Sequence, residues 1–539
     1  MTGMPDRGRA AVAAANPLAT EAALTILRLG GSAVDAAIAA QAALTVVEPN
    51  ASGIGGGAIL LVHEAGAVCA FDGISAAPAE VPERLETDFN GRTVPSDRAM
   101  FGGRTVAVPG ALRALEAAHR RFGRLPWKDL FAPAIALAAE GFALAPYVVR
   151  TLLENPTMRD EAMASRLYCG GADAPLAPGT VIRNPELAET LIAIAEGGAD
   201  AFYLGDIAAR IVAAVRGDVF DGRMTMADLA GYRAQERAAP AFALGAWRVA
   251  TAPLPAYGGI AAGQLVGIAA RLGITGIGAV PSEQEIHLLA ESGRVAFADR
   301  EHYADPDHAG PDHLGNARAA DVATMLSPDY LARRARHVDH LRRNDRIPAG
   351  HTDGLGGSMT SHVSIADAMG QVVSMTTTIN QNFGARIAVG GFYLNNALTN
   401  FALQPISHGR RVANAMAPGK RPRTSIAPCI VMDAEGRPIA AVGAGGGFRI
   451  IGYVANALLR LAGGMRDPAA ILAAPHAMNW SGSTEIEPAI GHHAQALAAR
   501  GHFVVTRRFD GGTQMVLRDG DSWLAGGDKR RDGVGLVLP

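Results

Sequence analysis

The stretch that decides the fold of this chain reads MTSHVSIAD over residues 359–367 and, after Gly370, VVSMTTTIN over residues 372–380. In the first segment a histidine and a serine alternate with a valine and an isoleucine, and the second segment is rich in β-branched residues. Both features are typical of strands, and the Asp-Ala-Met-Gly sequence between the segments favours a turn. The stretch therefore predicts a β-hairpin with Thr360 at its leading edge.

A glycine-rich segment, DGLGGS at residues 353–358, runs directly into this hairpin. It has no apolar period, so it predicts an irregular lead into the first strand. Cleavage between Met359 and Thr360 would free the α-amine of Thr360. Because an α-amine ordinarily has a pKa of about 7.7–8.0, it can deprotonate the hydroxyl of the same residue near neutral pH. The stretch thus predicts a self-cleaving precursor, and the alternative is an ordinary surface hairpin.

Helices and a second hairpin are expected around the first one. An apolar stripe predicts a helix over residues 19–29, and Ser32 with Asp35 resembles a capping box that starts another helix ending at Val47. Residues 425–432 and 438–442, joined by the turn DAEGR, predict the second hairpin. With strands at residues 58–62 and 66–68, the two hairpins are expected to supply an antiparallel sheet covered by helices.

Composition excludes several classes of protein. The 539 residues are 49% hydrophobic and 19% charged, with a formal net charge of −2, which indicates a large core and no broad nucleic-acid footprint. Three cysteines, odd in number and far apart in the sequence, favour a reducing compartment and packing roles. No secretory segment or apolar span of membrane length is evident, so we expect a cytoplasmic protein with no membrane partner.

Two segments that suggest ligand sites have better structural explanations. The glycines of SGIGGG at residues 52–57 follow a predicted helix and precede a strand, the reverse of a dinucleotide loop, so we expect close packing there instead. Residues 301–313 are rich in aspartate and histidine but lack the spacing of a zinc hydrolase, and Pro306 and Pro311 indicate a turn-rich loop. We therefore expect no metal and no cofactor at either segment.

Motifs along nearly the whole chain resemble one known family. The hairpin is matched by LNN at residues 394–396, KRPRTS at 420–425 and GGGFRII at 445–451, and upstream by GGSAVDAA at 30–37, GGG at 55–57 and ADREHYADPD at 298–307. In this order they resemble the γ-glutamyltransferases and their relatives among the N-terminal-nucleophile hydrolases. The resemblance implies an α+β fold, a four-layer αββα sandwich. It also implies a large segment, 1–359, and a small segment, 360–539, that together form one catalytic domain.

The resemblance assigns roles to individual residues. Thr360 is the expected nucleophile, Thr378 is expected to hydrogen-bond the catalytic amine, and Gly446 and Gly447 are expected to hold the oxyanion. Glycine N–H groups ahead of an apolar helix are well placed to hold negative charge. The substrate-binding residues that it implies are Asn380, Asn400, Thr424 and Ser425. Because Thr378 and Asn380 are two residues apart on a predicted strand, we expect their side chains on one face.

Two positions depart from the family pattern where a γ-glutamyl group would be held. Ile74 replaces the arginine that clamps the α-carboxylate, and Asn400 replaces the acidic residue that pairs with the α-ammonium. Each charge-assisted bond contributes roughly 1.5–3 kcal/mol, so the loss of both predicts about a hundredfold loss of discrimination or more. Arg386, Arg410 and Arg411 are nearby cations that would suit an acyl group ending in a carboxylate but lacking the amine.

Three hypotheses for function remain open. The first is a self-processing amidohydrolase or acyltransferase that forms an acyl-enzyme on Thr360 from γ-glutamyl amides such as glutathione and passes it to water or an amine. The second is the same machinery acting on a glutaryl-type or small dicarboxylic monoamide, as in cephalosporin acylase-like members. The third is an unprocessed, non-catalytic binding protein. For the enzymes, the expected partners are a small amide, the acceptor and the other cleaved segment, with further homo-oligomerisation left open.

Overall fold

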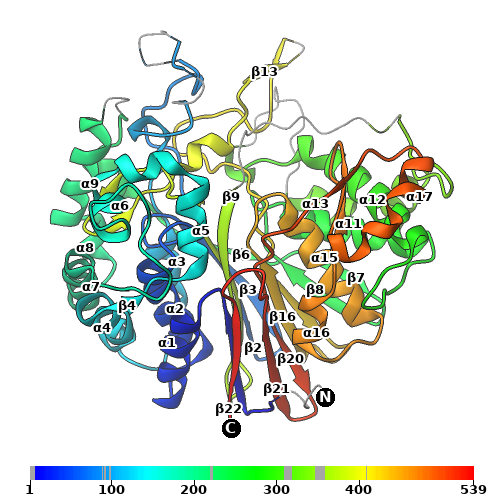
Figure 1. Ribbon diagram of the computed structural model, residues 1–539, viewed down its shortest axis with the longest axis horizontal. Coiled ribbons are helices and arrows are strands. Elements are labelled where there is room, and N and C mark those ends of the chain that lie inside the picture. Colours follow the sequence, from blue (N-terminus) through cyan, green and yellow to red (C-terminus); the bar gives the residue numbers. More distant parts are fainter. Residues whose placement is uncertain are drawn as a thin grey trace.

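Two antiparallel sheets form the centre of the computed structural model, which describes residues 6–87, 89, 93–95, 99–218, 222–308, 319–345, 347, 358–407 and 409–539 (Figure 1). The first sheet has the order β22 (Val534–Leu538), β1 (Ala10–Ala14), β9 (Ser358–Ala366), β10 (Val372–Gln381), β2 (Gly57–Glu64), β3 (Ala67–Gly73) and β6 (Gln235–Ala238). The second has the order β21 (Ser522–Gly527), β20 (Thr513–Asp519), β16 (Pro438–Ala444), β15 (Cys429–Met432), β8 (Trp247–Thr251) and β7 (Ala241–Leu244). Short strands pair outside these sheets, among them β17 (Ala477–Met478) with β18 (Thr484–Ile486).

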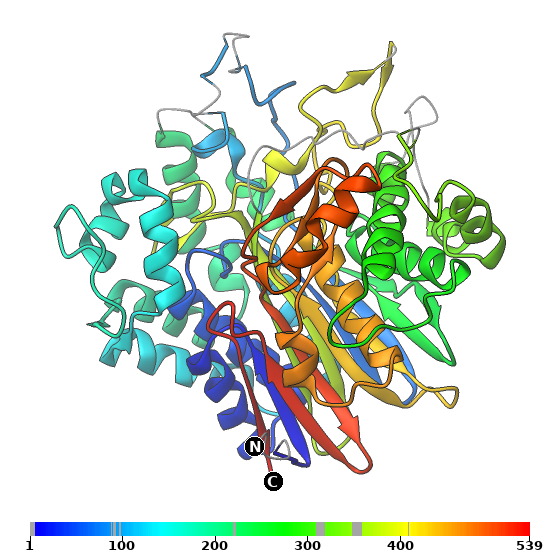
Figure 2. The ribbon, with the colours of Figure 1, turned by 45° about the vertical axis from the view of Figure 1, so that its right-hand side comes forward.

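Helices cover both outer faces of the sheets (Figures 1 and 2). On one side lie α1 (Pro17–Arg28), α2 (Ala33–Val47), α3 (Ala111–Phe122), α4 (Ala132–Glu140), α5 (Pro146–Glu154), α6 (Ala162–Tyr168), α7 (Pro185–Gly197), α8 (Asp200–Tyr203) and α9 (Asp206–Gly217). On the other side lie α11 (Gly258–Arg271), α12 (Glu283–Ala298), α15 (Arg449–Ala462), α16 (Pro468–Ala473) and α17 (Ala494–Ala499). The shorter helices are α10 (Met226–Gly231), α13 (Ala319–Met325) and α14 (Pro328–Ala335). Among the described residues, no helix combines the length and apolarity that a membrane crossing requires.

Three apolar layers follow from this arrangement. One cluster packs α1–α4 against the first sheet, and another packs α11, α12 and α15 against the second. A third cluster lies between the sheets and takes residues from both, including Ala13 and Leu61 from the first and Ile430 and Val516 from the second. The order helix, sheet, sheet, helix agrees with the expected four-layer sandwich.

The two predicted hairpins exist, but they do not share one sheet. Strands β9 and β10 form the middle of the first sheet, whereas β15 and β16 form the middle of the second. The sheets meet through side chains: the hydroxyl of Ser374 donates to the carbonyl of Val442, and that of Ser364 donates to the carbonyl of Gln514. The expectation of one sheet was wrong because strand alternation indicates which residues share a face and says nothing about which sheet a hairpin joins.

Helix α2 packs against β9 and β10, the two strands of the first hairpin. The hydroxyl of Ser32 accepts from the N–H of Asp35, whose carboxylate accepts from the N–H of Ser32, so the predicted capping box is confirmed. Every residue of α2 is buried. A mostly apolar helix that is buried on every face belongs to the core of a large protein, and α2 packs against the first sheet as part of that core.

The buried hairpin is polar on the face that meets the second sheet. His362 is fully buried, hydrogen-bonds the hydroxyls of Thr376 and Ser364, and leaves no room for a side chain at Gly443, where a Cβ would lie 2.3 Å from its ring. Burial disfavours the charged imidazolium and lowers the pKa of His362 to about 3. The surface-hairpin alternative is thereby excluded, since Thr360 to Ala366 are all buried.

The depressed pKa of His362 makes the fold sensitive to acid. Between its ordinary pKa of 6.5 and about 3, the unfolded chain binds a proton that the folded chain does not, so stability falls as pH drops through this range. The expected loss from this group is about 2 kcal/mol between pH 7 and pH 5. Thermal unfolding at both pH values should show a smaller acid-induced drop for His362→Gln than for the wild type, although the variant starts from a lower Tm. Equal drops would contradict the assignment.

Candidate active site

Thr360 lies in the middle of the first sheet, with 1% of its surface exposed. Opposite it, the pairing of β9 with β10 shifts register: Ser361 pairs with Thr377, but Met359 pairs with Asn380. The extra residue makes a β-bulge, a feature that redirects side chains next to active sites. The bulge brings the hydroxyl oxygens of Thr360 and Thr378 to 3.3 Å from each other.

The bulge also changes the position of Asn380. Its φ is 79°, and its N–H donates to the hydroxyl of Thr378 over 2.8 Å. Its side-chain amide donates to the hydroxyl of Thr399 over 2.7 Å and to the carbonyl of Asn396 over 3.1 Å. The regular alternation expected for Thr378 and Asn380 is therefore interrupted, because the bulge and the positive φ reorient the second residue.

The carbonyl of Thr360 is held from two sides. The buried guanidinium of Arg531 donates to it over 2.8 Å. Gly445 packs directly on it, because a Cβ at Gly445 would lie only 1.8 Å from this oxygen. A side chain is excluded at Gly445, and the loop that follows is thus held against β9.

That loop carries the two glycines predicted to hold an oxyanion. Gly446 and Gly447 have φ values of 122° and 63°, which glycine adopts without strain, and they immediately precede α15. Within the described residues, neither of their N–H groups has a hydrogen-bond acceptor. The hydroxyl of Ser425 donates to the carbonyl of Gly447 over 3.0 Å. The predicted hydroxyl pair Thr424–Ser425 therefore lies beside the glycine loop.

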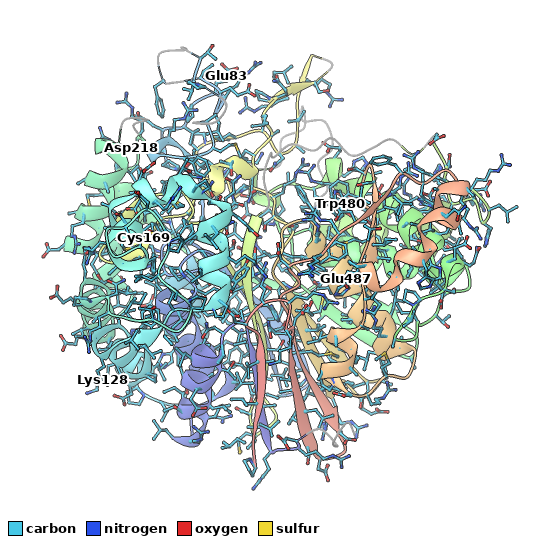
Figure 3. All side chains as sticks on the ribbon, viewed as in Figure 1. Glu83, Lys128, Cys169, Asp218, Trp480 and Glu487 are labelled. Atoms are coloured by element: carbon cyan, nitrogen blue, oxygen red, sulfur yellow. The ribbon has the colours of Figure 1, made fainter. Side chains whose placement is uncertain are left out.

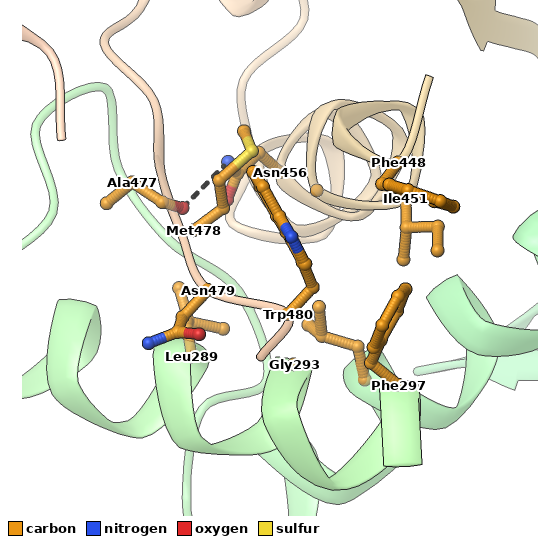
Figure 4. Close-up of a pocket in the computed structure, with 12 residues that line it drawn as sticks. Leu289, Gly293, Phe297, Phe448, Ile451, Asn456, Ala477, Met478, Asn479 and Trp480 are labelled. Carbon is orange, nitrogen blue, oxygen red and sulfur yellow. Dashed lines mark hydrogen bonds between the residues drawn. The ribbon is translucent and has the colours of Figure 1, made fainter. Parts of the chain in front are cut away.

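The far end of the loop is anchored by aromatic packing. Phe448 meets Phe297 edge to face at 5.7 Å, and the guanidinium of Arg300 lies 5.1 Å above its ring. Behind Phe448 is a small apolar pocket whose lining includes Phe297, Ile451, Met478 and Trp480 (Figure 4). Trp480 belongs to the half of the molecule built on α11, α12 and α15 (Figure 3). This packing fixes the start of α15 and thereby the direction of the glycine N–H groups.

The positions that depart from the family pattern lie near residues that contact Thr378 or Asn380. Gly57 pairs with Thr378 in the sheet, and a Cβ at Gly57 would lie 3.1 Å from the Cα of Ile74. Asn400 ends the short turn that also contains Thr399, the partner of Asn380. Both residues are thus close to the predicted donor-binding residues, and neither supplies a charge.

Two of the candidate compensating cations make contacts with other groups of the protein. Arg386 donates to the hydroxyl of Thr157 over 2.7 Å and stacks on Phe101, 3.7 Å from the ring centre. Arg410 and Arg411 belong to the outlying ribbon of β13 (Ile406–Ser407) and β14 (Arg410–Arg411), where Arg411 donates to the carbonyl of Met416 (Figure 1). The contacts of Arg386 and Arg411 are therefore with groups other than Thr360. The glycine-rich residues 353–357 lie outside the described residues.

The sequence did not identify three residues that lie near Thr360: Arg531, Glu48 and Ser52. The hydroxyl of Ser361 donates to Glu48, and the hydroxyl of Ser52 donates to Ser361 over 2.9 Å. An acidic residue directly after a mostly apolar helix was a signal for Glu48. Nothing in the local sequence of Arg531, 171 residues beyond Thr360, indicates the contact.

Comparison with known proteins agrees with the geometry. Residues 19–538 match the family model described as gamma-glutamyltranspeptidase. The chain is 35% identical to the acylase ACY 1 proenzyme of Pseudomonas sp. strain SE83 and 33% identical to the glutathione hydrolase proenzyme of Pseudomonas aeruginosa, each over 98% of this chain and 94% of the relative. The cephalosporin acylase of Bacillus halodurans superposes with a TM-score of 0.83 at 26% identity, covering 100% of this chain and 98% of that one. The chain therefore belongs to the γ-glutamyltranspeptidase family and is an enzyme of the N-terminal-nucleophile hydrolase type.

Proposed function

We propose that this enzyme cleaves its own chain between Met359 and Thr360 and then uses Thr360 to take the acyl group from a small amide. The observation that carries the proposal is the arrangement at Thr360: a buried threonine, a second hydroxyl at 3.3 Å and two glycine N–H groups ahead of a helix. In the acylation step, the Thr360 hydroxyl attacks the amide carbonyl and its proton passes to the freed α-amine. Gly446 and Gly447 hold the oxyanion; its collapse breaks the C–N bond, and the leaving amine takes the proton from the α-amine. Water or an acceptor amine then attacks the Thr360 ester and releases the acyl group, and the proton of the attacking group returns to the Thr360 hydroxyl through the α-amine.

The sheet topology supports lasting association of the two segments after cleavage. In the first sheet, β9, β10 and β22 come from residues 360–539 apart from the first two residues of β9, and β1, β2, β3 and β6 come from residues 1–359. The second sheet is shared in the same way, with β7 and β8 from the large segment. Intact mass under denaturing conditions should therefore show two fragments that elute together under native conditions. A single full-length species that persists would contradict self-processing.

The first candidate donor is a γ-glutamyl amide such as glutathione, the class named for the Pseudomonas aeruginosa relative. The second candidate is an amide whose acyl group carries a terminal carboxylate and no α-amine. Ile74 and Asn400 favour it, because neither can pair with the charges of an amino-acid head. The relatives named acylase ACY 1 proenzyme and cephalosporin acylase support a donor other than a γ-glutamyl amide.

Rates on γ-glutamyl-4-nitroanilide and glutaryl-4-nitroanilide separate the two donors, since they differ only by the α-amino group. If Asn400 sets the specificity, the glutaryl compound should be equal or better for the wild type. Asn400→Asp should then shift the ratio of kcat/KM toward the glutamyl compound by about tenfold or more, because one charge-assisted bond is restored. A wild-type preference of about a hundredfold for the glutamyl compound would support the first donor class instead.

A further inference from the structure

A buried acid lies directly behind the nucleophile strand. Glu48 follows the last residue of α2 and is 2% exposed. The hydroxyl of Ser361, the residue after the nucleophile, donates to the Glu48 carboxylate, and the hydroxyl of Ser52 in turn donates to Ser361 over 2.9 Å. This chain of hydroxyl groups ties the nucleophile strand to α2.

A buried cation, the guanidinium of Arg531, lies next to β9. Arg531 is 3% exposed, donates to the carbonyl of Thr360 over 2.8 Å, and lies 4.8 Å above the ring of Tyr147. Its charge and that of Glu48 interact favourably. Glu48 and Arg531 therefore attach to consecutive residues of β9, one through the Ser361 side chain and one through the Thr360 carbonyl.

Other ionisable groups complete this cluster. Burial raises the pKa of Glu48 to about 7, against the opposing effects of Arg531 and of the hydrogen bond from Ser361. The negative charge of Asp532 also raises the pKa of Glu48. The Asp532 carboxylate accepts from the N–H of Tyr147 over 3.0 Å. Asp510 interacts with Arg531 and forms an ion pair of 3.7 Å with Arg150. The net charge beside Thr360 thus changes near neutral pH through Glu48.

We propose that Glu48 is a positioning residue for the reaction at Thr360, holding the nucleophile strand through Ser361 and setting the charge that the α-amine of Thr360 experiences together with Arg531. The proposal rests on Thr360 being the nucleophile. A hydrocarbon side chain would fill the end of an apolar helix at lower desolvation cost, so a carboxyl at this place needs a reason beyond packing. The ionised carboxylate favours the ammonium form of a nearby amine, and its removal makes the amine a free base at lower pH.

The test compares wild type, Glu48→Gln, Glu48→Ala and Ser361→Ala as processed enzymes, on the nitroanilide that the wild type prefers. Glu48→Gln keeps an acceptor for Ser361 but no ionisation, so the acid limb of its kcat/KM profile should move to lower pH by about half a unit or more. Glu48→Ala and Ser361→Ala lose the link between strand and helix, and kcat should fall about 10- to 100-fold with KM little changed. Asp35→Asn is the matched control, because it makes the same change in a buried acid at the other end of α2, about 20 Å away. Its pH profile should coincide with that of the wild type.

An unshifted acid limb in Glu48→Gln, or an unchanged kcat in Ser361→Ala, would overturn the proposal. If Glu48→Gln does not unfold cooperatively, it is not properly folded, and the kcat of Ser361→Ala alone tests the proposal, since that substitution removes only one hydroxyl group. Thr360→Ala separates the two levels of inference. If Thr360→Ala is active, Thr360 is not the nucleophile and the proposed function is wrong. If Thr360→Ala is inactive but Ser361→Ala behaves like the wild type, only the proposed role of Glu48 is wrong.

Discussion

Thr360→Ala should neither cleave itself nor turn over any amide, with activity lowered by at least about 10⁴-fold. In the proposed mechanism the same hydroxyl serves both reactions: it attacks the carbonyl of Met359 during processing and the substrate carbonyl afterwards. Thr360 is buried and its hydroxyl is within hydrogen-bond distance of the Thr378 hydroxyl. Removal of the Thr360 hydroxyl therefore costs Thr378 one hydrogen bond. Intact mass should show one species of full length, and nitroanilide release should stay at background.

Stability and chemistry can be separated in this experiment. The loss of one hydroxyl contact is expected to change the free energy of unfolding by about 1 kcal/mol, so the Tm of Thr360→Ala should stay close to that of the wild type. Thr360→Ser is the matched control, because it keeps the hydroxyl and the future α-amine and should still be processed. A Thr360→Ala protein that is cut at the same bond would mean that another group is the nucleophile.

Gly445→Ala should lower kcat/KM by about 10²–10³-fold, the loss typical of removing an oxyanion donor. The new Cβ would stand 1.8 Å from the carbonyl oxygen of Thr360 and 2.6 Å from a guanidinium nitrogen of Arg531. Because the Thr360 carbonyl belongs to a central strand, the glycine loop is displaced and the strand is not. The N–H groups of Gly446 and Gly447 move with the loop. Steady-state kinetics on processed enzyme measures the loss, and the rate of fragment formation measures the effect on cleavage.

Gly217→Ala provides the comparison for this substitution. Gly217 ends α9, and no heavy atom lies within 4 Å of a Cβ placed there. Alanine is favoured over glycine in helices by up to about 1 kcal/mol, so this variant should be as active as the wild type and as stable or slightly more stable. Full activity in Gly445→Ala would show that the loop tolerates displacement and that Gly446 and Gly447 do not hold the oxyanion.

Local patterns predicted the elements around the site well. The hairpin that carries Thr360, the capping box at Ser32 and the glycine loop before α15 all follow from short-range preferences of the backbone. The motif order along the chain predicted the family, which the comparisons confirm. The glycines at residues 55–57 also pack where expected, since a Cβ at Gly56 would lie 2.1 Å from the carbonyl of Thr378.

The sequence by itself determined the elements around the site and the candidate nucleophile, because these depend on residues close together in the chain, and the order of its motifs determined the family. Tertiary structure alone decided that the two hairpins lie in different sheets, that the His362 face meets the second sheet, and that β10 bulges opposite Thr360. It also decided that Glu48 and Arg531, which lie near opposite ends of the chain, contact neighbouring residues of β9. The physical reason is that long-range burial forces these polar groups to find partners, and the partners depend on how the sheets and helices pack.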